Sequence, residues 1–168
     1  MNNSKLQLII EALEKLEKKE TIYICRPLVN HEEFTDWAKS QGFKTTLAPD
    51  ELHATLAFSK KPVDWSLLTP EKHKLVSDDI ASRQVEQLGD KGAIVLRFED
   101  QNLTNRWQEI LDIGAHWQHD GYRPHVTITY DPGTVDLESV EPYDGELVFG
   151  PEKFAEVDEN WADKIKEK

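Results

Sequence analysis

Two stretches of the sequence share one pattern: LHATLAFS at residues 52–59 and PHVTITYD at residues 124–131. Apolar and polar side chains alternate in both, which predicts two strands that each bury one face. On the first strand His53 and Thr55 share the polar face; on the second, His125 shares it with Thr127. Each strand therefore presents an imidazole and a hydroxyl on the face opposite its apolar side chains.

The same stretches mark an internal repeat. A shift of 72 positions superimposes four pairs: Ile22 on Ile94, Gly42 on Gly114, His53 on His125 and Thr55 on Thr127. Each half then has the order strand, helix, glycine stop, strand with His-x-Thr. The sequence therefore predicts two lobes related by a pseudo-twofold axis, with the two histidine strands as equivalent elements.

Other patterns complete an α+β prediction with mostly antiparallel strands. Helices are expected over residues 4–19, 31–41 and 102–117, a strand over 21–28, a loop over 60–74, a hairpin formed by 76–89 and 92–99, and a last strand pair within 146–157. We expect three segments: an amphipathic helical extension at 1–19, a single bilobal domain at 20–161, and a charged tail at 162–168. The apolar face of the extension is expected to pack on its own domain or on a second copy.

Length and charge limit the functions. The chain has 168 residues, enough for one domain, and its formal net charge is −12. That charge argues against binding of long DNA or RNA, whose phosphates attract clustered cations, but it allows a small nucleotide in a local basic pocket. No apolar run approaches the roughly 20 residues that span a bilayer, so we expect a cytoplasmic protein. Cys25 is the single cysteine, which excludes an internal disulfide.

Two imidazoles beside two hydroxyls suit one kind of chemistry. Histidine has a pKa near 6.5, so close to neutrality one ring is a base while its partner is an acid. A phosphodiester next to a ribose hydroxyl needs such a pair, and two threonines can donate to its non-bridging oxygens. This chemistry needs no metal or other cofactor. The nearest metal alternative is the segment HWQHD at residues 116–120, where His116 and His119 could share one face of a helix, but no third ligand is evident.

The two His-x-Thr strands resemble the paired signature of the 2H (two-histidine) phosphoesterase superfamily. Within it, the chain is most similar to the phage anti-CBASS nucleases, which degrade the cyclic oligonucleotide signals of bacterial antiphage defence. The closer similarity rests on YICRPL at 23–28, WAK at 37–39, LHAT at 52–55, GDKG at 89–92 and RPHVTITY at 123–130. It covers residues 20–161 and implies a bilobal fold around a central cleft. It also implies that a phage-encoded chain acts in the host cytoplasm.

The resemblance also implies roles for single residues. His53 and His125 would act as general acid and base, and Thr55 and Thr127 would hold the phosphate. Tyr23 is a candidate to stack on a base, Trp161 resembles a C-terminal aromatic that folds over the ligand, and Glu156 could bind a base edge. The candidates to offset ligand phosphates are Arg123, Arg26, Lys60 and Lys61.

Three alternatives stay open beside hydrolysis of cyclic di- and trinucleotides. One is a 2′,3′-cyclic phosphodiesterase that acts on RNA ends, which the acidic composition disfavours. Another is a sponge that binds a cyclic nucleotide without cutting it, although binding alone does not need two titrating imidazoles. The last is an interaction protein, which leaves the repeated His-x-Thr unexplained. The sequence does not decide the preferred bases, the oligomeric state or which histidine acts first as the base.

Overall fold

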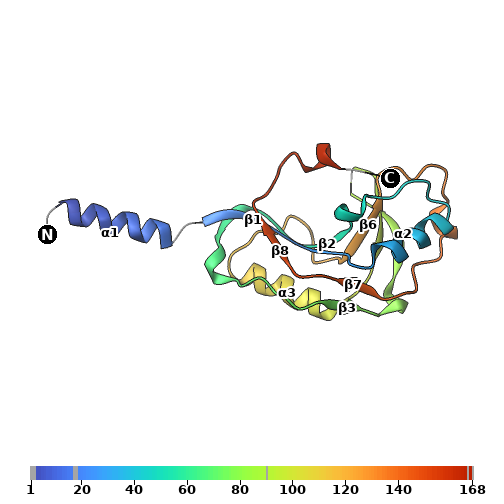
Figure 1. Ribbon diagram of the computed structural model, residues 1–168, viewed down its shortest axis with the longest axis horizontal. Helices are drawn as coiled ribbons and strands as arrows, with labels where there is room; N and C mark the ends of the chain where they lie inside the picture. The colour runs from blue at the N-terminus through green and yellow to red at the C-terminus, as the bar shows by residue number, and fades with distance from the viewer. Residues whose placement is uncertain (1–2, 17–18, 90, 166, 168) are drawn as a thin grey trace.

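A computed structural model describes residues 3–16, 19–89, 91–165 and 167 of the chain (Figure 1). Its α-helices are α1 (Asn3–Leu16), α2 (His31–Ser40) and α3 (Gln101–Asp112). Its strands are β1 (Lys19–Pro27), β2 (His53–Asp64), β3 (Leu75–Ser77), β4 (Gln84–Leu88), β5 (Ala93–Arg97), β6 (His125–Thr129), β7 (Leu147–Phe149) and β8 (Lys153–Ala155). The predicted α+β class is confirmed.

One antiparallel sheet joins the two halves of the repeat. Its strand order is β4-β5-β6-β2-β1-β8, so the two histidine strands lie side by side at its centre. They pair at Ala54 and Val126, two residues that the 72-position shift also relates. The two halves are the units β1-α2-β2 and β5-α3-β6, and β8 and β4 are the outer strands. The pseudo-twofold axis therefore passes between β2 and β6.

Two glycines end the helices in the same way in both halves. Gly42 follows α2 with φ of +101°, and Gly114 follows α3 with φ of +107°. Residues with a Cβ rarely adopt these angles, so glycine is favoured directly after the helix C-terminus. The repeat seen in the sequence thus extends to backbone conformation.

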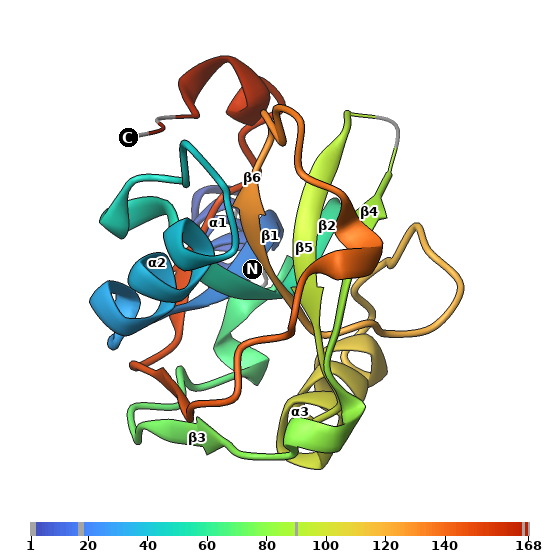
Figure 2. The same ribbon diagram turned by 90° about the vertical axis from the view of Figure 1, so that its right-hand side faces the viewer.

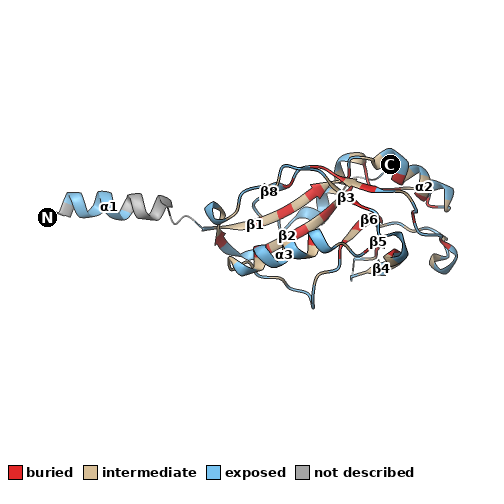
Figure 3. Ribbon diagram, turned by 90° about the horizontal axis from the view of Figure 1, so that it is seen from below, coloured by how far each residue is buried: buried red, intermediate tan, exposed pale blue. Residues whose placement is uncertain are grey.

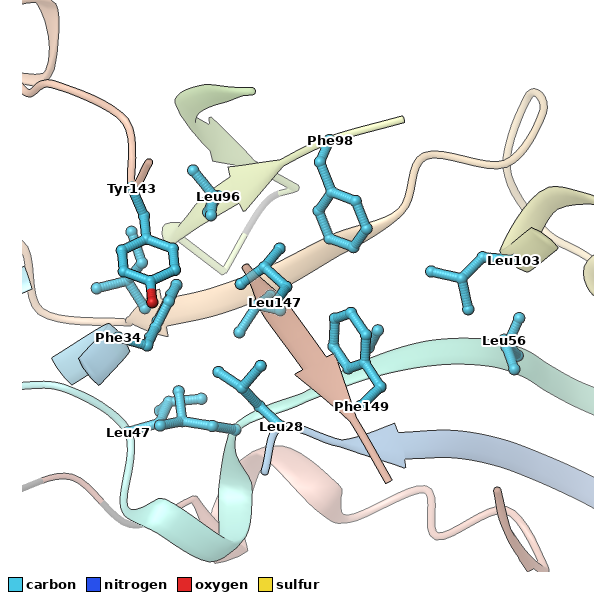
Figure 4. Close-up of a cluster of buried hydrophobic side chains, with 14 of the residues drawn as sticks. Leu28, Phe34, Leu47, Leu56, Leu96, Phe98, Leu103, Tyr143, Leu147 and Phe149 are labelled. Carbon is cyan, nitrogen blue, oxygen red and sulfur yellow. The ribbon is translucent and has the colours of Figure 1, made fainter. Parts of the chain in front are cut away.

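The hydrophobic core lies on one face of the sheet. Phe34 of α2 and Leu103 of α3 are fully buried against strand residues that include Leu56 and Leu96 (Figure 4). Phe98 and Phe149 stack there with ring centroids 5.9 Å apart, which ties the small β3-β7 sheet to the large one. Because the helices and β3-β7 cover this face, the polar residues of β2 and β6 lie on the other.

The C-terminal strands differ from the prediction. The expected pair within 146–157 is wrong, because β7 pairs with β3 and β8 pairs with β1. Between them the Gly150 N–H donates to the Pro27 carbonyl at 2.9 Å, and the chain passes from the small sheet to the large one. Each strand has only three residues, so its partner is decided by tertiary packing.

Two further segments depart from expectation. The expected loop over 60–74 is wrong at its start, because β2 continues to Asp64 opposite Lys19 of the lengthened β1. The expected hairpin is confirmed only for β4 and β5, since the residues before β4 form β3 and a short 3₁₀ turn at Ile80–Ser82. Helix α3 also ends at Asp112, five residues before its predicted end.

Helix α1 extends away from the folded body (Figures 1 and 3). Leu6 is 49% exposed and Leu8 is 65% exposed, so these side chains do not pack on the domain. The side chains of Leu13 and Leu16, which the prediction placed on the same face, lie outside the described residues. None of the described helices has the length and apolar composition that a membrane crossing requires.

Candidate active site

The face of the sheet opposite the core carries the four residues of the repeated motif, which we call the His/Thr face: His53 and Thr55 on β2, His125 and Thr127 on β6. All four are half-buried, while Ala54 and Val126 between them point into the core. The predicted alternation is confirmed over residues 53–56 and 125–128, and the adjacency of the strands brings the two motifs together. Beyond these residues the prediction is wrong, because Ala57, Ser59 and Thr129 are buried.

The pairing of β2 with β6 falls between the histidine and the threonine of each motif. Their strands are antiparallel and pair at Ala54 and Val126. In such a ladder the residues one step to either side face each other. Continued by one residue, this register directs His53 toward Thr127 and His125 toward Thr55. The pairing therefore brings the two motifs together on one face of the sheet.

Both histidines are oriented by a main-chain carbonyl two residues earlier. Nδ1 of His53 lies 2.6 Å from the Glu51 oxygen, and Nδ1 of His125 lies 2.8 Å from the Arg123 oxygen. A carbonyl can only accept, so Nδ1 carries the proton in each ring. Nε2 is therefore the nitrogen that is available for acid–base chemistry in both halves.

Burial shifts both histidines in the same direction. It lowers the pKa of His53 below its ordinary value, against the opposing hydrogen bond to Glu51. Burial also lowers the pKa of His125, where the Arg123 carbonyl opposes the shift and the neighbouring His53 and His119 add to it. Two close imidazoles resist double protonation, so a state with one proton on the pair is favoured over a state with two.

Tyr23 lies on β1 beside the first motif, and its hydroxyl contacts both motif residues. The phenol oxygen is 2.8 Å from His53 Nε2 and 3.2 Å from Thr55 Oγ1. Burial raises the pKa of Tyr23, so the phenol stays protonated. Sequence reasoning considered only the ring of Tyr23. Alternation along 21–28 places the residue on the polar face, but no sequence signal indicated that its hydroxyl reaches His53.

The second motif has a tyrosine that sequence reasoning missed. Tyr130 directly follows β6; burial raises the pKa of its hydroxyl, and the nearby Thr127 side chain opposes this shift. Its ring centroid lies 6.3 Å from that of Trp161 in the short helix Trp161–Lys164, which Figure 2 shows beside the end of β6. The Trp161 ring has a second contact, with Lys91, whose Nζ lies 5.6 Å from the ring centroid. The structure therefore brings Trp161 to the Thr127 side of the His/Thr face.

The other residues predicted from the sequence differ in exposure and in their contacts. Glu156 is exposed and follows Ala155, the Cα partner of Tyr23. The Arg123 side chain is exposed, and its carbonyl orients His125. Arg26 as a phosphate ligand is wrong: it is buried on the core face, where it donates to the carbonyls of His73 and Gly150 at 2.8 and 2.9 Å.

The metal alternative gains no support from the described part of the chain. Within it, no group of three or more His, Cys, Asp or Glu side chains is placed to hold a metal ion. His119 instead packs edge-on against Trp117, with ring centroids 5.6 Å apart.

Comparison with known proteins decides the family. The family model described as "Anti-CBASS protein Acb1" matches residues 20–164. The chain belongs to the Acb1 family of anti-CBASS proteins. The relative from Caulobacter sp. (strain RHG1) is 47% identical over 154 residues, which are 89% of this chain and 25% of the relative. The one from Sphingomonas paeninsulae is 48% identical over 146 residues, or 83% of this chain and 23% of the relative.

The Acb1 relatives differ in length. The chain spans about a quarter of the two bacterial relatives. It is also 30% identical over 124 residues to the Acb1 of Escherichia phage RB16, where the match covers 71% of this chain and 69% of the relative. The resemblance to phage anti-CBASS proteins is therefore confirmed.

Solved structures confirm the fold. Escherichia coli LigT complexed with 3′-AMP matches 81% of this chain and 86% of its own, with a TM-score of 0.51 and 17% identity. A crystal structure of a phosphoesterase matches 83% and 99%, with a TM-score of 0.51 and 14% identity. The Acb1 chain thus has the predicted 2H phosphoesterase fold.

Proposed function

We propose that this Acb1 chain is a metal-independent phosphodiesterase that hydrolyses cyclic di- and trinucleotide second messengers and thereby blocks CBASS antiphage defence. One observation carries the proposal: β2 and β6 pair between the two His-x-Thr motifs, at Ala54 and Val126, with Nδ1 of both rings anchored on a carbonyl. This arrangement offers two proton-transfer groups and two hydroxyl donors around one phosphate.

The reaction follows from these four groups. Nε2 of one histidine takes the proton of a ribose 2′-hydroxyl, and O2′ forms a bond to phosphorus. The bond between phosphorus and O5′ breaks, and Nε2 of the other, protonated histidine gives its proton to O5′. Thr55 and Thr127 donate to the non-bridging oxygens, whose charge grows in the transition state. The resulting 2′,3′-cyclic phosphate is then opened by water with the two histidines in exchanged roles.

We assign the surrounding residues to substrate binding. The rings of Tyr23 and Trp161 would stack on the bases, at about 1–3 kcal/mol for each base. Glu156 would accept a hydrogen bond from a base edge, and the exposed Arg123 guanidinium would offset a ligand phosphate. These contacts suit a ligand of two or three nucleotides, since the net charge of −12 disfavours a long nucleic acid.

The proposal extends to the organisation of the chain and its place of action. Residues 20–161 would form the catalytic domain, with the helix before them and the tail after them dispensable for the chemistry. The enzyme would act in the host cell cytoplasm when a phage encodes it, because the cyclic nucleotide signal is produced there.

The test is turnover of a panel of cyclic di- and trinucleotides in excess EDTA, with His53→Ala and His125→Ala as controls. Loss of the cyclic substrate with wild type alone would establish metal-free cleavage that needs both histidines. Tight binding without loss would instead support the sponge. If the panel is neither bound nor cut but an RNA oligonucleotide with a 2′,3′-cyclic end is opened, the RNA-end alternative replaces the proposal.

A further inference from the structure

The two halves of the His/Thr face are not equivalent at the reacting nitrogen. His53 Nε2 has the Tyr23 phenol 2.8 Å away. The 72-position shift places Tyr23 on Val95, which pairs with Thr127 on β6 and has no hydroxyl. Within the described residues, Nε2 of His125 has no hydrogen bond. The pseudo-twofold symmetry is therefore broken by one phenol.

The positions of three protons follow from the partners. Nδ1 of His53 donates to the Glu51 carbonyl at 2.6 Å, so Nε2 of the neutral ring carries a lone pair. The phenol of Tyr23 has one proton, and it donates this proton to Nε2. Thr55 Oγ1, 3.2 Å from the phenol oxygen, can then donate to that oxygen. In the free protein the chain of donors thus runs from Thr55 to Tyr23 to His53.

We propose that Tyr23 is a positioning residue that holds His53 as the neutral base of the reaction and yields its place on Nε2 to the substrate's 2′-hydroxyl. This inference rests on the proposed phosphodiesterase function. When the 2′-hydroxyl donates to Nε2, the phenol turns its proton to Thr55 Oγ1. The Thr55 hydroxyl then keeps its proton and donates it in a hydrogen bond to a phosphate oxygen. Tyr23 thereby couples arrival of the nucleophile to binding of the phosphate.

The proton balance assigns the second histidine. His53 Nε2 takes the proton of the 2′-hydroxyl as O2′ bonds to phosphorus, and the bond from phosphorus to O5′ breaks. Protonated His125 gives its Nε2 proton to O5′, and Tyr23 stays neutral throughout. Burial lowers the pKa of both rings, and the Glu86 carboxylate of β4 opposes this shift at His125. The Tyr23 phenol, which donates to Nε2, instead favours the neutral ring of His53.

Other titratable groups lie near Tyr23 and the two histidines. From β1, Cys25 lies beside Tyr23 and is itself faced by Lys153 of β8. The Glu51 carboxylate acts on Tyr23 from the segment before β2. His119 faces His125 from the loop before β6. None of these groups stands between the phenol and His53 Nε2, so replacing Tyr23 changes the His53 contact directly.

Tyr23→Phe tests the inference, because it keeps the ring and removes only the hydroxyl. The matched control is Tyr122→Phe, whose hydroxyl donates to the Thr55 carbonyl at 2.7 Å and does not touch His53. The measurements are the ¹⁵N NMR titration of both active-site histidines in the free protein and the pH profiles of kcat and KM for a cyclic dinucleotide.

We expect Tyr23→Phe to raise the pKa of His53, since the neutral ring loses a hydrogen bond, and to leave His125 unchanged. We expect kcat to fall about tenfold, the effect of one hydrogen bond, with KM little changed. The acidic limb of the kcat/KM profile, which reports the free enzyme, should be displaced to higher pH. Tyr122→Phe should retain the wild-type titration and profile.

Two results would overturn the inference: an unchanged His53 titration in Tyr23→Phe, or a wild-type kcat and pH profile in that variant. If wild type itself cleaves no cyclic nucleotide, the proposed function fails and the base assignment fails with it. The titration then still reports separately whether Tyr23 holds His53 neutral.

Discussion

Replacing Thr127 by valine keeps the size and the β-branch of the side chain and removes only its hydroxyl. Thr127 is half-buried on β6 and lies near the Tyr130 hydroxyl. A hydroxyl has one donor, and the proposal directs that donor to a non-bridging oxygen of the substrate. Loss of one preorganised donor to a developing oxyanion lowers kcat by about 10²–10³-fold. We therefore expect Thr127→Val to lower kcat by this amount, with KM little changed.

The assay is release of linear product from a cyclic dinucleotide, separated by ion-pair chromatography, with folding checked by urea denaturation. Thr129→Val is the matched control, since Thr129 lies two residues further on β6, is fully buried, and accepts from the Asp131 N–H at 2.9 Å. It should lose about 1 kcal/mol of stability and retain kcat. If Thr127→Val cleaves at the wild-type rate, or Thr129→Val loses as much activity as Thr127→Val, the assignment of the hydroxyl to the phosphate is refuted.

Three other outcomes are expected. Burial lowers the pKa of His53 and His125 in the folded state, so the unfolded chain binds more protons as the pH falls through the ordinary value of about 6.5. The free energy of unfolding should therefore decrease below that pH. Urea titrations at several pH values should show a flatter dependence for the double variant His53→Ala, His125→Ala. Gly42→Ala and Gly114→Ala should each lose about 1 kcal/mol or more of stability, because both glycines have φ above +100°; equal stability to wild type in either variant would contradict the strain argument. Deletion of residues 1–18 should leave kcat and Tm unchanged, because the described side chains of α1 do not pack on the domain, and a lower Tm would show that the helix stabilises it.

The motif strands were predictable because their information is local. Alternation places Thr55 and Thr127 on one face, and each histidine is oriented by a carbonyl two residues before it in the same chain segment. The repeat then predicts that the two strands are equivalent, and a twofold relation brings them together. The helix stops at Gly42 and Gly114 depend equally on neighbouring residues.

The contacts that sequence reasoning missed depend on register and on short strands. The Tyr23 hydroxyl reaches His53 from the neighbouring strand, and β1 and β2 pair with an irregularity between Ile24 and Cys25 that alternation does not predict. Strands β7 and β8 have three residues each, too few for alternation to indicate a partner. The sequence suggests Arg26 as a cation for a ligand phosphate, but it lies on the buried face of β1 next to two carbonyls that come from distant segments. In each case the deciding neighbour lies far away in sequence.

The axis between Ala54 and Val126 has a consequence for how such an enzyme can be built. A homodimer of one half would contain the same four groups, but its two histidines would be identical by symmetry and would compete equally for a single proton. Joining the halves in one polypeptide allows each copy to change independently. Tyr23 on one side and Val95 on the other are such a difference, so the covalent link lets two copies of one motif divide the labour of giving and taking a proton.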